Sequence, residues 1–165
     1  MSHSVAGEPP ATGRRAAPLT TAVYSVAEWD LLTTLPGRTV VAAAMPAPGR
    51  PARGVAAGLA GLDAVAAGRA FDSDLVRAVV AAIYARHDGP PPGAAGRLTD
   101  VVDLLADARA AARVLDRRAD PADSAAYRQW VQSIAARVCR AETDGNPAPA
   151  DRRFLDRLGG ALGLR

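Results

Sequence analysis

The chain has 165 residues and a formal net charge of +3, from 20 basic against 17 acidic residues, a size that fits one domain with a tail. Every basic residue is arginine and alanine fills most small positions. This usage is typical of a GC-rich bacterial genome, so arginine cannot be interpreted as chosen over lysine for its geometry. The only cysteine, Cys139, excludes an intrachain disulfide and a thiol cluster for zinc or iron–sulfur, and so small a charge excess is weak evidence for nucleic-acid binding.

Residues 1–22 are predicted to form a disordered arm, because they are rich in small and turn-forming residues and lack apolar periodicity. The first helix follows Ser25, where Glu28 completes a capping box. Its apolar stripe consists of Trp29, Leu32 and Leu35. Pro36 has no backbone N–H and predicts an interruption, after which a second, short helix runs to Ala44.

A third helical segment is predicted from about Ala52 to Gly68, after a loop at 45–51. The residues expected on its buried face are Val55, Leu59, Leu62 and Val65 or Ala66. Three glycines accompany them at small-residue spacing: Gly54, Gly58 and Gly61. A glycine costs a helix about 0.5–1 kcal/mol relative to alanine. A close helix contact, within the fold or at an interface between chains, therefore explains these glycines as well as composition bias does.

The fourth helix is predicted to be capped by Asp72 or Ser73 and to end near His87, before a glycine- and proline-rich break at 88–96. Its apolar face consists of Leu75, Val76, Val79, Val80 and Ile83.

The fifth helix is predicted to start at Arg97 or Leu98 and to run to about residue 118, and Asp120 followed by Pro121 opens the sixth. The sixth has the clearest stripe: Tyr127, Trp130, Val131, Ile134 and Val138, with Trp130 expected to be buried. A turn at 143–149 precedes the last helix, which carries Phe154, Leu155, Leu158 and Leu162. No segment alternates with a period of two, so the sequence predicts an all-α, single-domain bundle of six or seven helices over residues 23–165.

Charged residues flank the apolar stripe of the fifth helix on both sides. The acidic flank consists of Asp100, Asp103 and Asp107, and the basic flank of Arg109, Arg113 and Arg117. One hypothesis is that the three acids converge with Asp144 on a metal ion. The other interpretation is a solvated helix whose flanks pair with neighbouring helices.

No catalytic set is recognisable, and we predict neither catalytic residues nor a cofactor. Of the two histidines, His3 lies in the predicted arm and His87 at a helix end, without a second ligand at helical spacing. Cys139 lies near the apolar stripe of its helix and is expected to be an inert, semi-buried thiol. The glycines at 58–68 do not follow a strand and precede no Lys-Ser/Thr pair, so they are not a phosphate-binding loop.

Residues 142–164, ETDGNPAPADRRFLDRLGGALGL, resemble the closing helix–loop–helix of the TerB-like (tellurite-resistance protein B-like) helical proteins. The matching residues are Asp144, Gly145, Pro149, Phe154, Leu155, Leu158, Ala161, Leu162, Gly163 and Leu164. The resemblance implies a helical fold and a role in stress response or as a scaffold near membranes. Of the family's acidic site, only Asp144 and Asp151 could be carried over, because the earlier turn at 45–54 contains no acid.

These observations favour a non-catalytic protein-interaction module that associates with itself or docks a partner, with Gly54, Gly58 and Gly61 as the candidate interface. The alternative is a TerB-like protein that binds a metal or small ligand through its acidic cluster. We expect no nucleic-acid partner, no membrane span and a cytoplasmic location, because no basic–aromatic motif, long apolar stretch or secretion signal is evident.

Overall fold

The computed structural model describes residues 21–87 and 100–164. Within them it contains the helices α2 (Val26–Ala44), α3 (Val55–Ala67), α4 (Asp74–His87), α5 (Val101–Arg118), α6 (Pro121–Arg140) and α7 (Pro149–Ala161), and a 3₁₀ turn, η1 (Gly68–Ala70). These described residues form no strand, only an isolated bridge between Ala47 and Arg50. The predicted all-α, single-domain fold is confirmed.

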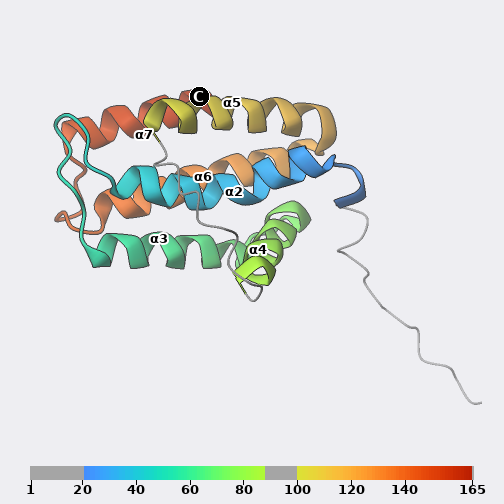
Figure 1. Cartoon of the computed structure of the whole chain (residues 1–165), viewed down its shortest axis with the longest axis horizontal. Helices are drawn as coiled ribbons and strands as arrows, with labels where there is room; N and C mark the ends of the chain where they lie inside the picture. Colours follow the sequence, from blue (N-terminus) through green and yellow to red (C-terminus); the bar gives the residue numbers. More distant parts are fainter. Residues whose placement is uncertain (1–20, 88–99, 165) are drawn as a thin grey trace, which may run out of the picture.

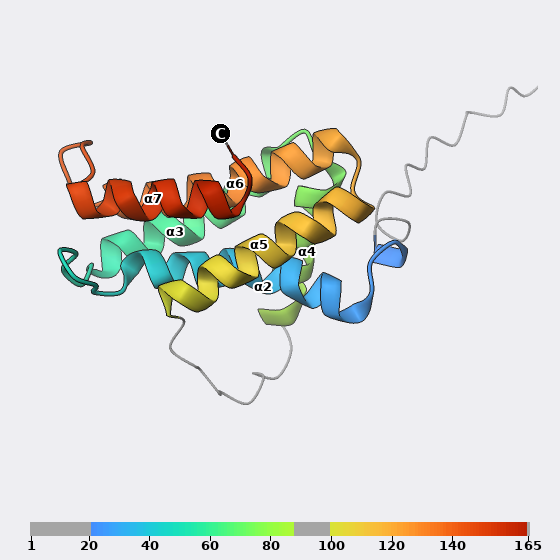
Figure 2. The same cartoon turned by 90° about the horizontal axis from the view of Figure 1, so that it is seen from above.

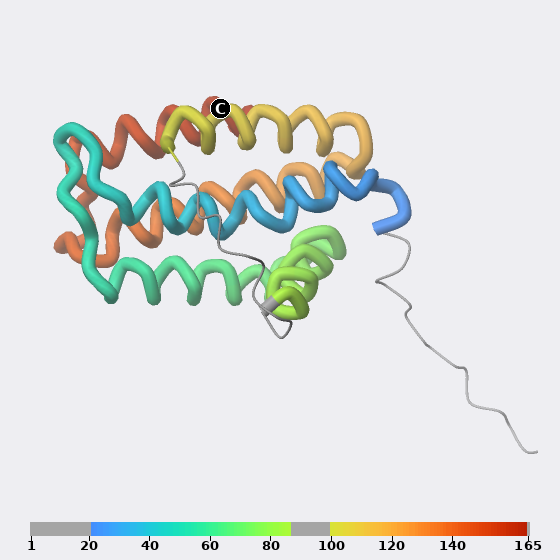
Figure 3. The backbone as a smooth tube through the Cα atoms, in the orientation of Figure 1, coloured from blue at the N-terminus to red at the C-terminus, as the bar shows by residue number. Residues whose placement is uncertain are grey.

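Figure 1 shows α2 and α6 in the middle of the bundle, with α5 and α7 on one side and α3 on the other. The central helix α6 contacts each of the other five, and α2 contacts α3, α4, α5 and α6. From above, α5 runs obliquely to α7 (Figure 2). The backbone tube shows that the loops joining α2 to α3 and α6 to α7 lie at the same end of the bundle (Figure 3).

Helix α2 continues through Pro36, so the predicted interruption and second short helix are wrong. Proline removes the N–H that would donate to the carbonyl of Leu32, one turn earlier. The hydroxyl of Tyr127 in α6 donates to that carbonyl instead, at 2.7 Å and in a buried position. A tertiary hydrogen bond thus replaces the missing helical one, and a single helix spans both predicted segments.

The buried face of α3 is opposite to the predicted one. The side chains of Val55, Leu59 and Leu62 are 80%, 57% and 59% exposed. The residues that face the core are Ala57, Gly61, Ala64 and Val65, of which only Val65 belongs to the predicted set.

The inversion of α3 follows from how closely it packs. A Cβ on Gly61 would lie 2.6 Å from Val40 Cγ1 in α2 and 2.9 Å from Val138 Cγ2 in α6. A Cβ on Gly68 would lie 2.8 Å from Trp130 Cε2. Real Cβ atoms do not approach other atoms so closely, so small side chains must face the core and the larger ones face outward.

Helix α5 begins at Val101 rather than at the predicted Arg97 or Leu98, because Asp100 is its N-cap and accepts from Val102 N at 3.4 Å. The predicted break at 88–96 lies outside the described residues, as does the predicted arm up to residue 20. The last two residues assigned to the arm, Thr21 and Ala22, already have a helical conformation.

The other caps and the α6 stripe agree with the prediction. Ser25 and Glu28 form the capping box, with bonds of 3.1 and 2.9 Å, and Ser73 rather than Asp72 caps α4. Trp130 is fully buried, and its Nε1 donates to the carbonyl of Ala64 at 3.1 Å. Of the described helices, none combines the length and the apolar composition needed to cross a bilayer.

Candidate functional site

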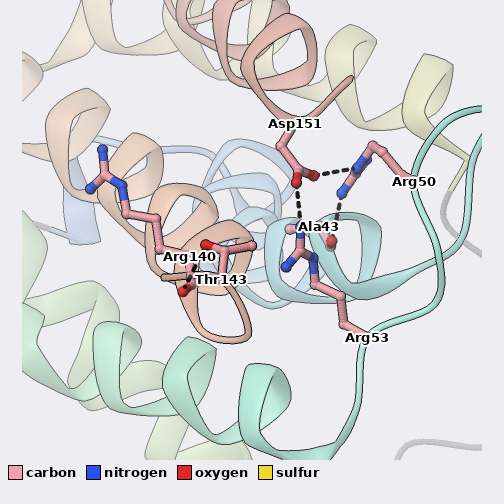
Figure 4. Close-up of polar contacts among 6 residues, drawn as sticks. All are labelled: Ala43, Arg50, Arg53, Arg140, Thr143 and Asp151. Carbon is pink, nitrogen blue, oxygen red and sulfur yellow. Dashed lines mark hydrogen bonds and ion pairs between the residues drawn. The ribbon is translucent and has the colours of Figure 1, made fainter. Parts of the chain in front are cut away.

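A buried cluster of two arginines and one aspartate joins the α2–α3 loop to α7 (Figure 4). The Nε of Arg50 donates to Asp151 Oδ1 at 2.9 Å, and Arg53 Nη2 pairs with Asp151 Oδ2. The three side chains are 4%, 7% and 2% exposed for Arg50, Arg53 and Asp151, respectively. Buried charges are rare in proteins unless they are paired, so this cluster is the most unusual polar feature of the fold.

A tight turn presents Arg50 to this cluster. Ala47 and Arg50 exchange two backbone hydrogen bonds of 2.9 and 2.7 Å. Pro48 and Gly49 occupy the two central positions, and Gly49 has a φ of +75°. A type II turn typically has proline at its first central position and a glycine with positive φ at its second.

The cluster also neutralises helix ends. Arg50 Nη2 donates to the carbonyl of Ala43 at 2.5 Å, near the C-terminal end of α2, whose own last turn contains no basic residue. Asp151 lies in the first turn of α7, which has no side-chain cap. Both placements put charge where the helix dipole favours it.

The charges within the cluster are not fully balanced. Burial alone would raise the pKa of Asp151, but hydrogen bonds and charge from Arg53 and Arg50 outweigh burial and hold it below its ordinary value. The Nε of Arg53 is buried without a hydrogen-bond partner in the described part of the chain. Two guanidinium groups therefore share one carboxylate.

Cys139 lies next to this cluster. It is fully buried, and burial, followed by the charge of Asp151, raises the pKa of its thiol to about 11. At neutral pH the thiol is protonated, which favours the predicted inert role over a nucleophilic one.

The three glycines of the predicted interface lie in different surroundings. Gly54 is the N-cap of α3, and its N–H donates to Glu142 Oε1 at 2.7 Å. A Cβ on Gly58 would meet nothing within 4 Å, whereas Gly61 lies at the close contact with Val40 and Val138. Of the three, Gly61 has its role inside the fold, and Gly58 has open space above it.

The four acidic residues of the predicted metal site have different surroundings. Asp100 caps α5 and Asp107 pairs with Arg38 of α2, while Asp103 is exposed and Asp144 is exposed in the α6–α7 turn. Within the described ranges, no three His, Cys, Asp or Glu residues lie close enough together to hold a metal ion. The structure does not gather these four acids into one site.

Comparison of the chain with protein-family models, with curated proteins and with solved structures gives no match. The resemblance of residues 142–164 to TerB-like proteins therefore rests on the sequence pattern alone.

The sequence reasoning missed the Arg50–Arg53–Asp151 cluster. One local signal was available, an acid in the first turn after Pro149, where the dipole of α7 favours negative charge. Nothing local identifies its partner, because Arg50 precedes Asp151 by 101 residues.

Proposed function

We propose that the chain is a non-catalytic helical module that associates with a second copy of itself through the outward face of α3. The observation that carries this proposal is the exposed stripe formed by Val55, Leu59 and Leu62. These residues recur at i, i+4 and i+7 and so lie on one side of the helix. Contiguous exposed apolar residues are typical of interaction surfaces.

A second copy is the favoured occupant because the face of α3 is almost free of charge. Asp63 is the only charged residue among the 13 of this helix, so two copies placed face to face repel little. The open space above Gly58 lets another helix approach closely. Figure 1 shows α3 at the edge of the bundle, on the side away from α5 and α7.

The dimer is expected to be weak. A helix of 13 residues is about 20 Å long, so a pair of such helices buries less than the roughly 1,200–2,000 Å² of a standard interface. We expect a dissociation constant in the micromolar to millimolar range, which corresponds to a binding free energy of about −8 to −4 kcal/mol.

The test is sedimentation equilibrium over a wide range of protein concentration. The wild type should show a monomer–dimer equilibrium, and Leu59→Asp/Leu62→Asp should remain monomeric with unchanged helicity. Val26→Asp is the matched control, because Val26 is 90% exposed on another helix and its change should leave the equilibrium as it is. A wild type that stays monomeric near 1 mM, or a double variant that dimerises equally, refutes the proposal.

Gly58→Leu gives a second test. A Cβ at this position would meet no neighbouring atom within 4 Å, so we expect the fold to tolerate the substitution while the dimer is weakened. Metal binding by the acidic residues is not proposed, because no observation brings Asp100, Asp103, Asp107 and Asp144 together.

A further inference from the structure

A hollow of about 390 Å³ lies beside the buried cluster, between the first turn of α5, one face of α7 and the turn at residues 47–50. We call it the α5–α7 hollow. Three arginines line it, Arg50, Arg153 and Arg157, together with one acid, Asp100. Its volume falls within the range of small-molecule sites.

Arg50 is fixed in place and still has hydrogen-bonding capacity. Its Nε and Nη2 are used by Asp151 and by the carbonyl of Ala43, and its guanidinium carbon lies 4.3 Å from the centre of the Phe154 ring. Its Nη1 forms no hydrogen bond with a described group, and it is not one of the buried atoms left without a partner. The side chain is only 4% exposed and lines the hollow, so a buried, immobilised cation borders the space that a bound molecule would occupy.

Arg153 and Arg157 add charge from α7. They are four residues apart and therefore lie on one side of the helix, where like charges repel. Both side chains are exposed, and neither forms an ion pair with another described residue. An anion between these side chains and Arg50 would relieve the repulsion.

Apart from Asp100, the remaining walls are apolar. Val101, Val102 and Phe154 line the hollow, and Val102 is 62% exposed. Asp100 introduces one negative charge at the start of α5, which disfavours an extended polyanion. The walls therefore suit a small molecule with one charged group and an apolar body.

We propose that the α5–α7 hollow binds a small organic oxyanion, whose charged group lies among Arg50, Arg153 and Arg157 and whose apolar body lies against Val101 and Val102. The planar fork of a guanidinium matches both carboxylate and phosphate oxygens, so an organic acid and a phosphate monoester share the required chemistry.

The test is calorimetric titration of the full chain with phenyl phosphate and with benzoate, and with inorganic phosphate and phenol for comparison. At least one of the two organic anions should bind more tightly than either comparison compound, and their ratio distinguishes the phosphate from the carboxylate. Arg153→Ala/Arg157→Ala should weaken binding at least about tenfold, because charge-assisted hydrogen bonds are lost. Arg152→Ala, an exposed neighbour on α7 that does not line the hollow, should stay within about twofold of the wild type.

Three outcomes overturn the proposal. One is no heat of binding up to about 10 mM ligand, where even millimolar affinity would be measured. Another is an equal affinity in the Arg153→Ala/Arg157→Ala and Arg152→Ala variants, and the third is equal binding of inorganic phosphate, which would leave the apolar walls without a role. The site does not depend on the α3 face, so Leu59→Asp/Leu62→Asp should bind the organic anion as the wild type does.

Discussion

Replacing Tyr127 by Phe tests how α2 tolerates a proline in its interior. The change removes one hydroxyl and leaves the ring in place. It strands the carbonyl of Leu32, which accepts from that hydroxyl at 2.7 Å in a buried position and has lost its helical donor to Pro36. A buried acceptor left without a partner costs about 1–3 kcal/mol, and we expect Tyr127→Phe to lower the free energy of unfolding by this amount.

The same change should cost less when residue 36 can donate. In a Pro36→Ala background the backbone N–H of residue 36 reaches the Leu32 carbonyl, so losing the hydroxyl no longer strands it. The double-mutant cycle should give a coupling energy of about 1 kcal/mol or more. Equilibrium urea unfolding followed by far-UV circular dichroism measures all four proteins.

The control for this cycle is Tyr84→Phe. Tyr84 is 38% exposed, and its ring stacks on the guanidinium of Arg69 while its hydroxyl bonds to none of the described groups. This change should alter stability by less than about 0.5 kcal/mol. An equal cost of Tyr127→Phe with and without Pro36 would refute the idea that the hydroxyl replaces the missing N–H.

Two further predictions concern α3 and the buried cluster. Gly61→Ala should destabilise by about 1–3 kcal/mol through overpacking, whereas Gly58→Ala should stabilise by about 0.5–1 kcal/mol because its Cβ meets no neighbour; equal thermal shifts would contradict this assignment. Asp151→Asn should lower the free energy of unfolding by about 3–5 kcal/mol at neutral pH, because the buried guanidinium groups lose their counter-charge. The folded-state pKa of Asp151 is lowered, so its contribution is present above the unfolded value of about 3.9 and lost as pH falls through the folded value. The difference in unfolding free energy between wild type and Asp151→Asn should therefore shrink below about pH 4, as acid unfolding curves would measure. A difference that stays constant would show that the carboxylate charge does not cause the loss of stability.

Local chemistry in the sequence predicted much of this fold. The capping box at Ser25 needs only residues three apart, and so does the pairing of Asp120 with the first turn of α6. The α6 stripe was correctly placed because its other faces are polar, so only one orientation buries the large side chains. In each of these cases the decisive information lies within a few residues.

The face of α3 could not be predicted in this way. Both of its sides are apolar, one built from valine and leucine and the other from alanine and glycine, so periodicity alone does not say which side is buried. The larger side chains of α3 were the natural choice for the core. Val40 and Val138, however, lie so close to Gly61 that a larger side chain on this side of α3 would have no room. The close packing of α3 against α2 and α6 decided the orientation, and that packing is a property of the whole bundle.

The polar contacts that the sequence did not predict answer a problem raised by its composition. Surfaces rich in alanine and glycine are smooth and give little preference for one helix register over another, since few side chains interlock. Two buried hydrogen bonds between helices supply that preference, Tyr127 of α6 to Leu32 O of α2 and Trp130 of α6 to Ala64 O of α3. Each joins a side chain to a backbone carbonyl of another segment, so sliding a helix by one turn would break it and strand a buried polar group. In a chain with so few aromatic residues, these directional contacts hold the helices in register, and the apolar contacts supply the bulk of the stabilisation.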